Sequence, residues 1–191
     1  MPQRGVRDVL VDLASAPRDV GAIDESECFI DATFASAKWS GEQIGPTKHG
    51  KGVRIVAIVD RHGLQLAINT RAANHHKVTL VQLSFKFYIV VAKPDNLIGN
   101  RAFDSDKLDD QLREEGIEMI APHRKNRVKA RTQDSRRLRR YERRWVAERF
   151  FAWIRWQRRF LVRWEYYAEN FLGIVQFASI AILLKQFLDR F

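Results

Sequence analysis

One stretch, residues 141–163, constrains the fold of this chain more than any other. It reads YERRWVAERFFAWIRWQRRFLVR, and its lack of proline and glycine predicts a long helix. On a helix that turns about 100° per residue, four polar residues fall within an arc of roughly 60°: Tyr141, Arg144, Glu148 and Arg155. Most of the large apolar residues of the stretch lie outside that arc, where they can bury. The polar stripe therefore faces something other than the core.

The same region concentrates positive charge. Residues 136–163 contain eleven arginines and only two acids, and the whole chain of 191 residues has a formal net charge of +10. An excess this clustered favours a polyanionic partner, most simply nucleic acid, over a solvated basic face without a partner. On the helix alone, Glu148 can be either a structural partner of the arginines or a functional carboxylate.

Composition places the chain among folded proteins. A hydrophobic content of 46% excludes global disorder, and the length suits one domain. The single cysteine, Cys28, excludes an intrachain disulfide and fits a reducing, intracellular setting. The first residues lack the apolar segment of a signal peptide. The apolar run 171–184 is interrupted by Gln176 and is too short for a bilayer of about 30 Å, so we expect a buried terminal helix in a soluble protein.

Alternation and turn residues predict the strands of the first half. After a lead-in segment, 1–26, three strand-like runs follow at 27–39, 53–60 and 64–70. The last two are joined by a short turn, so the three runs predict an antiparallel meander. A glycine-rich loop with Lys48 and Lys51 separates the first run from the second. It matches no phosphate-binding loop spacing, and we interpret it as a hairpin connection.

The second half alternates helices and strands. We expect a helix at 75–85 with Asn74 as its N-cap, and one or two strands at 87–92 and 96–103. They are followed by a helix at 105–116, a strand at 117–121, a basic loop at 122–135, the long arginine helix and a last helix at 164–191. This order predicts an α/β protein with the RNase H-like fold, whose mixed sheet combines the antiparallel meander with α/β crossovers. The expected domain covers residues 27–191.

Acidic residues mark three places that this fold would bring together. Asp31 interrupts the first strand, where a lone charge is costly unless it is paired or coordinated. The first strand lies beside the end of the fourth, here around 99–104, and a late helix can add Glu148. Three such carboxylates could hold two divalent ions for attack on a phosphodiester.

The long helix and its surroundings resemble the DDE-class transposases of bacterial insertion sequences. The family's helix reads Tyr, two residues, Arg, three residues, Glu, six residues, Lys. This chain matches that pattern with the polar stripe of the long helix, and Arg155 replaces the lysine. FIDATFASAKWSGEQIGPTKHGKG, VAIVDRHGLQLAI and TQDSRRLRRY are also similar to these enzymes, so the resemblance runs from about residue 27 to the end. It implies that Asp31 and Glu148 are the first and third catalytic acids.

The second acid position departs from the family pattern. Members usually read LIGDRAYDSD, whereas residues 97–106 read LIGNRAFDSD, so Asn100 stands where the family has its aspartate. An amide can coordinate a metal through its oxygen but brings no charge, so metal binding and rate should fall. Asp104 could substitute as a metal ligand if the strand end bends toward the site; otherwise it is a structural acid before the helix.

The resemblance implies a DNA transposase with Asp31, Asn100 and Glu148 in the catalytic and metal positions. It would use two Mg²⁺ or Mn²⁺ ions to cut transposon ends and transfer strands, in the bacterial cytoplasm at the nucleoid. The alternatives are a catalytically silent DNA-binding remnant and a nuclease acting on RNA. The residues expected to contact DNA are Tyr141, Arg144, Arg155, Lys48, Lys51, Arg124, Lys125, Arg127 and Arg140.

Double-stranded DNA is the expected partner, on which the protein would assemble as a homo-oligomer. Family members usually carry a helical DNA-binding region before the first acid, and only thirty residues precede Asp31 here. The chain therefore looks like the catalytic portion alone, which a separate N-terminal DNA-binding product could complete.

Overall fold

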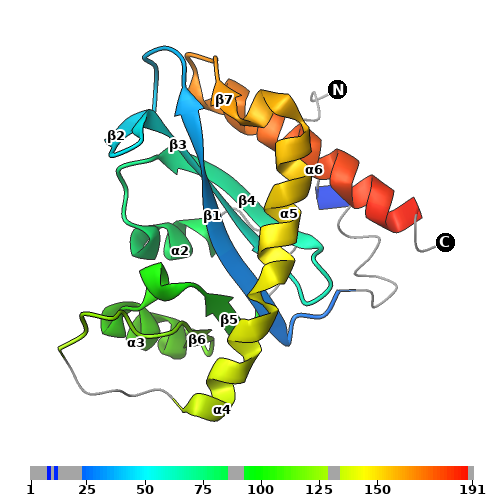
Figure 1. Ribbon diagram of the computed structural model, residues 1–191. Coiled ribbons are helices and arrows are strands. Elements are labelled where there is room, and N and C mark those ends of the chain that lie inside the picture. The colour runs from blue at the N-terminus through cyan, green and yellow to red at the C-terminus, as the bar shows by residue number, and fades with distance from the viewer. Residues whose placement is uncertain (1–7, 10, 13–22, 86–92, 129–133, 189–191) are drawn as a thin grey trace.

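The structure is a computed structural model that describes residues 8–9, 11–12, 23–85, 93–128 and 134–188. One mixed sheet carries helices on both faces (Figure 1). Its strands are β1 (Glu27–Ala37), β2 (Gly45–Thr47), β3 (Gly50–Val59), β4 (Gln65–Ala72), β5 (Asn96–Gly99), β6 (Glu118–Ile120) and β7 (Val162–Arg163). The α-helices are α2 (Lys77–Phe85), α3 (Asp106–Glu114), α4 (Ser135–Leu138), α5 (Trp145–Trp156) and α6 (Ala168–Leu188). The described part of the chain also contains the short 3₁₀ helices η1 (Arg101–Phe103), η2 (Arg139–Arg144) and η3 (Arg158–Phe160).

Strand β1 is the centre of the sheet. It pairs antiparallel with β3 on one edge and parallel with β5 on the other. Strand β4 pairs antiparallel with the far edge of β3, and β6 pairs parallel with β5. The strand order is therefore β2-β3-β1-β5-β6, with β4 also paired to β3, and β3 alone runs antiparallel to β1. This is the RNase H-like arrangement, and both the expected fold class and the antiparallel meander are confirmed.

The two faces of β1 belong to two cores. Phe29 and Ala35 pack in the cluster that includes the apolar residues of α5 and α6. Cys28 and Ile30 pack in the other cluster, with residues of α2 and α3. Because side chains alternate along a strand, Asp31 shares the face of Phe29 and Ala35, which α5 covers. The strand thus presents its carboxylate to the arginine-rich helix.

The long helix expected at 141–163 is broken, and this prediction was wrong in its extent. Residues 139–144 form η2, α5 ends at Trp156, and Gln157 adopts an extended conformation with φ −87° and ψ 96°. After η3, the two residues of β7 pair parallel with Ser36 and Ala37 at the end of β1. Burial of Phe160, which is 4% exposed, and pairing of β7 outweigh the helix propensity of this segment.

The last helix also differs from its expectation. It begins at Ala168, not 164, and its 21 residues exceed the apolar run at 171–184. Among the described residues, α6 is the one helix with the length and apolar composition of a membrane span, a test that core helices also pass. Its Phe171, Val175 and Ala178 are fully buried in the core that β1 shares with α5.

The smaller elements mostly match. Ser105 caps α3 by accepting a hydrogen bond from the Leu108 amide, and Gly116 follows the helix with φ +73°, so the two residues bound the helix expected at 105–116. Helix α2 begins at Lys77, which is too late for Asn74 to be its N-cap. The strand expected at 87–92 falls outside the described residues. The strand expected at 96–103 is shorter than predicted: β5 ends at Gly99, because Arg101–Phe103 form η1, which the Asn100 side chain caps.

Candidate active site

Strand pairing places Asn100 beside Asp31. Ile30 pairs with Gly99 at the end of β5, so the next residue of each strand continues side by side. The Asn100 Nδ2 donates a hydrogen bond to Asp31 Oδ1 at 2.9 Å. Two positions 69 residues apart in sequence are therefore in direct contact.

The orientation of the Asn100 amide is fixed from both ends. Its Oδ1 accepts a hydrogen bond from the Ala102 backbone N–H at 3.0 Å, which caps η1. An ionised carboxylate only accepts and a backbone N–H only donates, so a flipped amide would lose both bonds. The oxygen that a cation would need is turned toward η1, and the amide hydrogens are turned toward Asp31.

Helix α5 brings Glu148 to the same place. A small cavity of about 10 Å³ is lined by residues from β1, the end of β5, η2 and α5: Phe29, Ile30, Asp31, Asn100, Arg144, Ala147 and Glu148. That volume holds roughly one water-sized species. The three positions singled out in the sequence, 31, 100 and 148, thus meet in one cavity.

The polar stripe contacts itself and β1. Arg144 Nη2 pairs with Glu148 Oε1 at 3.0 Å, and the Arg144 guanidinium lies 4.9 Å from the centre of the Tyr141 ring. Further along α5, Arg155 Nη2 donates to Thr33 Oγ1 at 2.5 Å. The Arg144 and Glu148 side chains are 42% and 50% exposed, so their pair adds little to stability and can open to another partner.

A comparison with protein families identifies the family of the chain. The model of one protein family, described as the transposase DDE domain, matches residues 22–183. The chain belongs to this family. A comparison with curated protein sequences finds no match.

Solved transposase structures resemble the domain at low identity. The piggyBac transposase synaptic complex with hairpin DNA is 12% identical, with a TM-score of 0.43, over 64% of this chain and 32% of that one. The Mos1 strand transfer complex is 9% identical, with a TM-score of 0.36, over 74% of this chain and 53% of that one. The transposase domain therefore spans about a third to a half of the length of these two chains.

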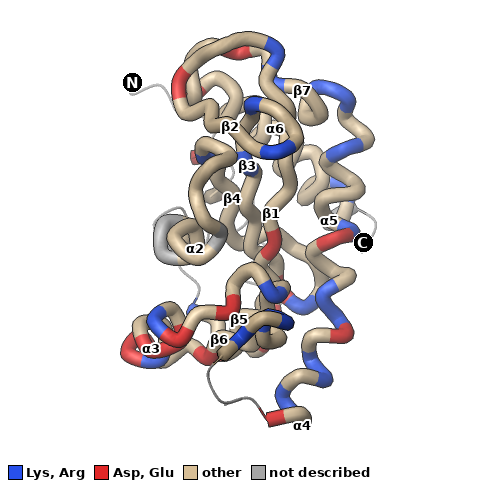
Figure 2. The backbone as a smooth tube through the Cα atoms, turned by 60° about the vertical axis from the view of Figure 1, so that its left-hand side comes forward, with Lys and Arg blue, Asp and Glu red and all other residues tan. Residues whose placement is uncertain are grey.

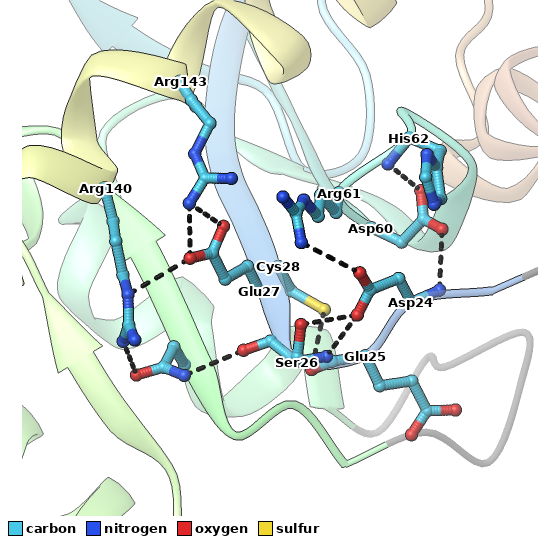
Figure 3. A network of polar contacts seen from close by, with 11 residues as sticks. Asp24, Glu25, Ser26, Glu27, Cys28, Asp60, Arg61, His62, Arg140 and Arg143 are labelled. Carbon is cyan, nitrogen blue, oxygen red and sulfur yellow. Dashed lines mark hydrogen bonds and ion pairs between the residues drawn. The ribbon is translucent and has the colours of Figure 1, made fainter.

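A buried carboxylate holds the start of the arginine-rich segment of the transposase domain (Figure 3). Glu27, at the start of β1, contacts Arg140 Nε at 3.1 Å and Arg143 Nη2 at 2.5 Å. Arg140 also donates to Asn96 Oδ1 at 2.7 Å, and Asn96 Nδ2 donates to the Ser26 carbonyl at 2.8 Å. This Glu27 network joins η2 to the beginnings of β1 and β5.

The Glu27 network holds η2, which leads directly into α5. Arg143 directly precedes Arg144, and η2 continues into α5 at Trp145. Sequence reasoning did not single out Glu27. The available signal was an acid at the start of an apolar strand in a chain with an arginine-rich segment to pair with it.

Asp104 is committed to a different cluster. Its carboxylate is 3% exposed and accepts hydrogen bonds from His123 Nδ1 at 2.9 Å, the Arg124 backbone N–H at 2.8 Å and Arg127 Nη1 at 3.1 Å. Burial raises the pKa of Asp104, but these donors together hold it below its ordinary value. The contacts favour the structural interpretation of Asp104, as an acid that ties segment 121–128 to the start of α3.

The basic residues expected to bind DNA fall into two groups. Arg124 donates to the carbonyls of Arg101 and Ala102, Arg127 pairs with Asp106 at 2.6 Å, and Arg140 belongs to the Glu27 network. Lys48 and Lys125 are exposed, and exposed Lys51 donates to Ser40 Oγ at 3.4 Å. The arginines therefore also have internal roles, while the lysines project from the surface. Figure 2 shows basic residues following one another along α5 and the segment before it.

The donor set fits a divalent ion only in part. In the described portion of the chain, no group of three or more His, Cys, Asp and Glu side chains could hold a metal ion. Asp31 and Glu148 supply two carboxylates at the cavity, whereas Asn100 presents amide hydrogens where a cation requires an oxygen. The family's chemistry generally depends on divalent metals, and this site lacks one of the acids for a two-ion centre.

Proposed function

We propose that this chain is the catalytic domain of a DNA transposase that binds double-stranded DNA and whose metal-dependent cleavage and strand transfer are impaired by Asn100. The observation that carries the proposal is the hydrogen bond from the Asn100 amide to Asp31. It joins the first and second positions of the expected acidic triad in a cavity that Glu148 also lines.

The impairment follows from charge and orientation. A bound Mg²⁺ or Mn²⁺ pair would activate a water or a 3′-hydroxyl and stabilise the leaving oxygen. Asp31 and Glu148 are the residues that would hold such ions. Replacing an aspartate by Asn100 removes one negative charge, and the amide satisfies a lone pair of Asp31 that a cation would otherwise use. Cation binding must therefore break two hydrogen bonds of Asn100 or proceed without it.

The arginines of the stripe are suited to hold the DNA backbone. Arg144 can exchange its half-exposed partner Glu148 for a phosphate, and Arg155 lies beside Thr33, two residues beyond Asp31 on the same strand face. Tyr141 supports Arg144 through its ring. Exposed Lys48 and Lys125 would add sequence-independent contacts to phosphates. Assembly of several copies on paired DNA ends belongs to the same proposal.

The experiment compares metal-dependent cleavage of DNA that carries the ends of the element by the wild-type chain and by Asn100→Asp. The restored carboxylate should raise the cleavage rate by at least about tenfold, because the third ligand regains its charge. Asn74→Asp, the same change at an exposed residue between β4 and α2, is the matched control and should change nothing. Equal cleavage by the wild type and Asn100→Asp would refute the assigned role of Asn100.

A catalytically inactive, DNA-binding remnant is the second candidate. The orientation of the Asn100 amide favours it, because the described residues that line the cavity include two carboxylates, Asp31 and Glu148, and an amide at the third position. In that case the wild type binds DNA but shows no cleavage above background, and only Asn100→Asp cleaves.

A further inference from the structure

Beyond the end of β1, large aromatic side chains are exposed to solvent. Trp39 is 61% exposed, and Trp164, Tyr166 and Tyr167 are 47%, 61% and 58% exposed. Figure 1 shows their two segments together, where the connection from β1 to β2 passes the connection from β7 to α6. We call these four aromatic residues, together with Lys38 and Lys51, the aromatic end. Large exposed aromatic side chains gathered on two adjoining segments are typical of an interaction site.

Hydrogen bonds fix the two segments to each other. The Lys38 amide donates to the Arg163 carbonyl and the Glu42 amide to the Tyr166 carbonyl, both at 2.9 Å. The Ala168 amide donates to Glu42 Oε2 at 3.1 Å. At Gly41 a Cβ atom would lie only 2.5 Å from the Tyr166 carbonyl oxygen, so this close approach requires glycine. The aromatic rings therefore project from a rigid base.

A buried arginine, Arg163, holds the backbone of the segment that carries three of these aromatic residues. Arg163 is 1% exposed, and its guanidinium donates to the carbonyls of Glu165 and Tyr166, each at 2.9 Å. Burial lowers the pKa of Arg163, because removal of the guanidinium from water disfavours its charged form. The hydrogen bonds to the two carbonyls offset this cost. The two carbonyls that it holds lie within the segment that carries Trp164, Tyr166 and Tyr167.

The charge around the aromatic end is positive. Segments 36–52 and 155–170 contain seven lysines and arginines and three glutamates. Two of those glutamates are engaged internally, Glu42 with the Ala168 amide and Glu165 with Arg159 at 2.8 Å. Lys38 Nζ lies 5.7 Å from the centre of the Trp164 ring, so a cation adjoins an exposed ring face. A polyanion that carries flat apolar rings complements a surface of exposed aromatic side chains and lysines. A second copy of this protein would instead place positive charges against positive charges.

We infer that the aromatic end binds unpaired nucleotides by stacking their bases on its exposed rings while its lysines contact their phosphates. The inference rests on the proposed function, because it assigns a place to a part of the DNA that the transposase domain holds. Ala37 lies six positions along β1 from Asp31, a span of roughly 20 Å. A DNA strand whose reacting phosphate lies at the mouth of the cavity would reach the aromatic end about six nucleotides away, at about 3.4 Å each. Single-stranded or frayed DNA at that distance is the ligand expected there.

The test measures binding of the full chain to three oligonucleotides of equal length: a blunt duplex, a duplex with an unpaired extension, and a single strand. 2-Aminopurine in the extension reports stacking through loss of its fluorescence. The wild type should bind the tailed duplex about tenfold more tightly than the blunt one and quench the probe. The double variant Trp39→Ala with Trp164→Ala should lose the quenching and the preference, yet bind the blunt duplex as the wild type does.

Two further variants separate stacking from folding. The double change to phenylalanine keeps an aromatic ring at both positions and should retain most of the preference. Phe177→Ala removes a ring that is 66% exposed on α6 and should retain all of it. A wild type that binds blunt and tailed duplexes equally would overturn the inference while leaving the proposed function intact. Failure to bind any DNA would overturn the proposed function itself. The inference would also be overturned if the double alanine variant kept the preference for the tailed duplex. The same holds if the double alanine variant differed from the wild type only in oligomeric state or in binding to anionic vesicles.

Discussion

At residue 100, one amide donates a hydrogen bond directly to Asp31. The Asn100 side chain satisfies Asp31 with an N–H and η1 with its oxygen, so it stabilises the cavity without a cation. An aspartate in its place could keep the bond to the Ala102 amide but would bring a second negative charge next to Asp31. Asn100→Asp would thus remove the hydrogen bond to Asp31 and place two like charges side by side, which a bound cation would have to neutralise.

The single residue Asp109 makes the stability of the fold depend on pH. Burial, followed by the negative charges of Asp104 and Asp106, raises the pKa of Asp109 to about 6. Because the folded pKa exceeds the unfolded value, the folded state binds more protons in between, and stability falls as pH rises from about 4 to about 6. We expect Asp109→Asn to stabilise the fold by about 1 kcal/mol at pH 7.5, after discounting for solvent screening and the loss of a charge in the first turn of α3. At pH 4 it should change little.

Chemical denaturation of Asp109→Asn and the wild type at the two pH values checks this. A gain that is equal at pH 4 and pH 7.5 would show that the titration of Asp109 is not its cause.

Among the elements, η2 depends on the Glu27 network. Glu27→Gln keeps the shape of the side chain but removes the charge that faces Arg140 and Arg143. Its carboxylate is 9% exposed, so we expect a loss of about 1 to 3 kcal/mol in the free energy of unfolding. Asp110→Asn is the control, because the Asp110–Arg113 pair is 69% and 75% exposed and should contribute within about 0.5 kcal/mol. Equal effects of the two variants in urea denaturation would contradict the structural role of the Glu27 network.

The elements that sequence reasoning predicted are those with local signals. Period-two alternation revealed β1, β3 and β4, and the Ser105 cap and Gly116 bounded α3. The break after Trp156 had no local signal, because the segment that follows contains good helix formers. What ends α5 is distant in sequence: β7 pairs with β1, and Arg163 holds the carbonyls of its own downstream loop.

The site likewise has features that the sequence predicted and features that required the fold. The family signature gave positions 31, 100 and 148, whereas the direction of the Asn100 amide depends on η1, which the sequence did not predict. The partners of Asp104 come from a segment about twenty residues away, so its structural role required the fold.

For the whole molecule, the net charge of +10 predicts how DNA binding responds to salt. If six or more phosphates are contacted, raising the salt from 50 to 200 mM should weaken duplex binding by about a thousandfold. Fluorescence anisotropy with a labelled duplex at several salt concentrations gives the slope. A slope near zero would contradict an interface built on the basic residues of α5 and its surroundings.

The most direct measurement is the thermal stability of the wild type and Asn100→Asp with and without Mn²⁺. Without metal, Asn100→Asp should melt several degrees lower, because two adjacent carboxylates replace a hydrogen bond that costs about 1 to 3 kcal/mol to lose. With Mn²⁺ it should regain that stability, while the wild type changes much less. The same Mn²⁺ response in both proteins would contradict the claim that the amide of Asn100 occupies the place of a metal ligand beside Asp31.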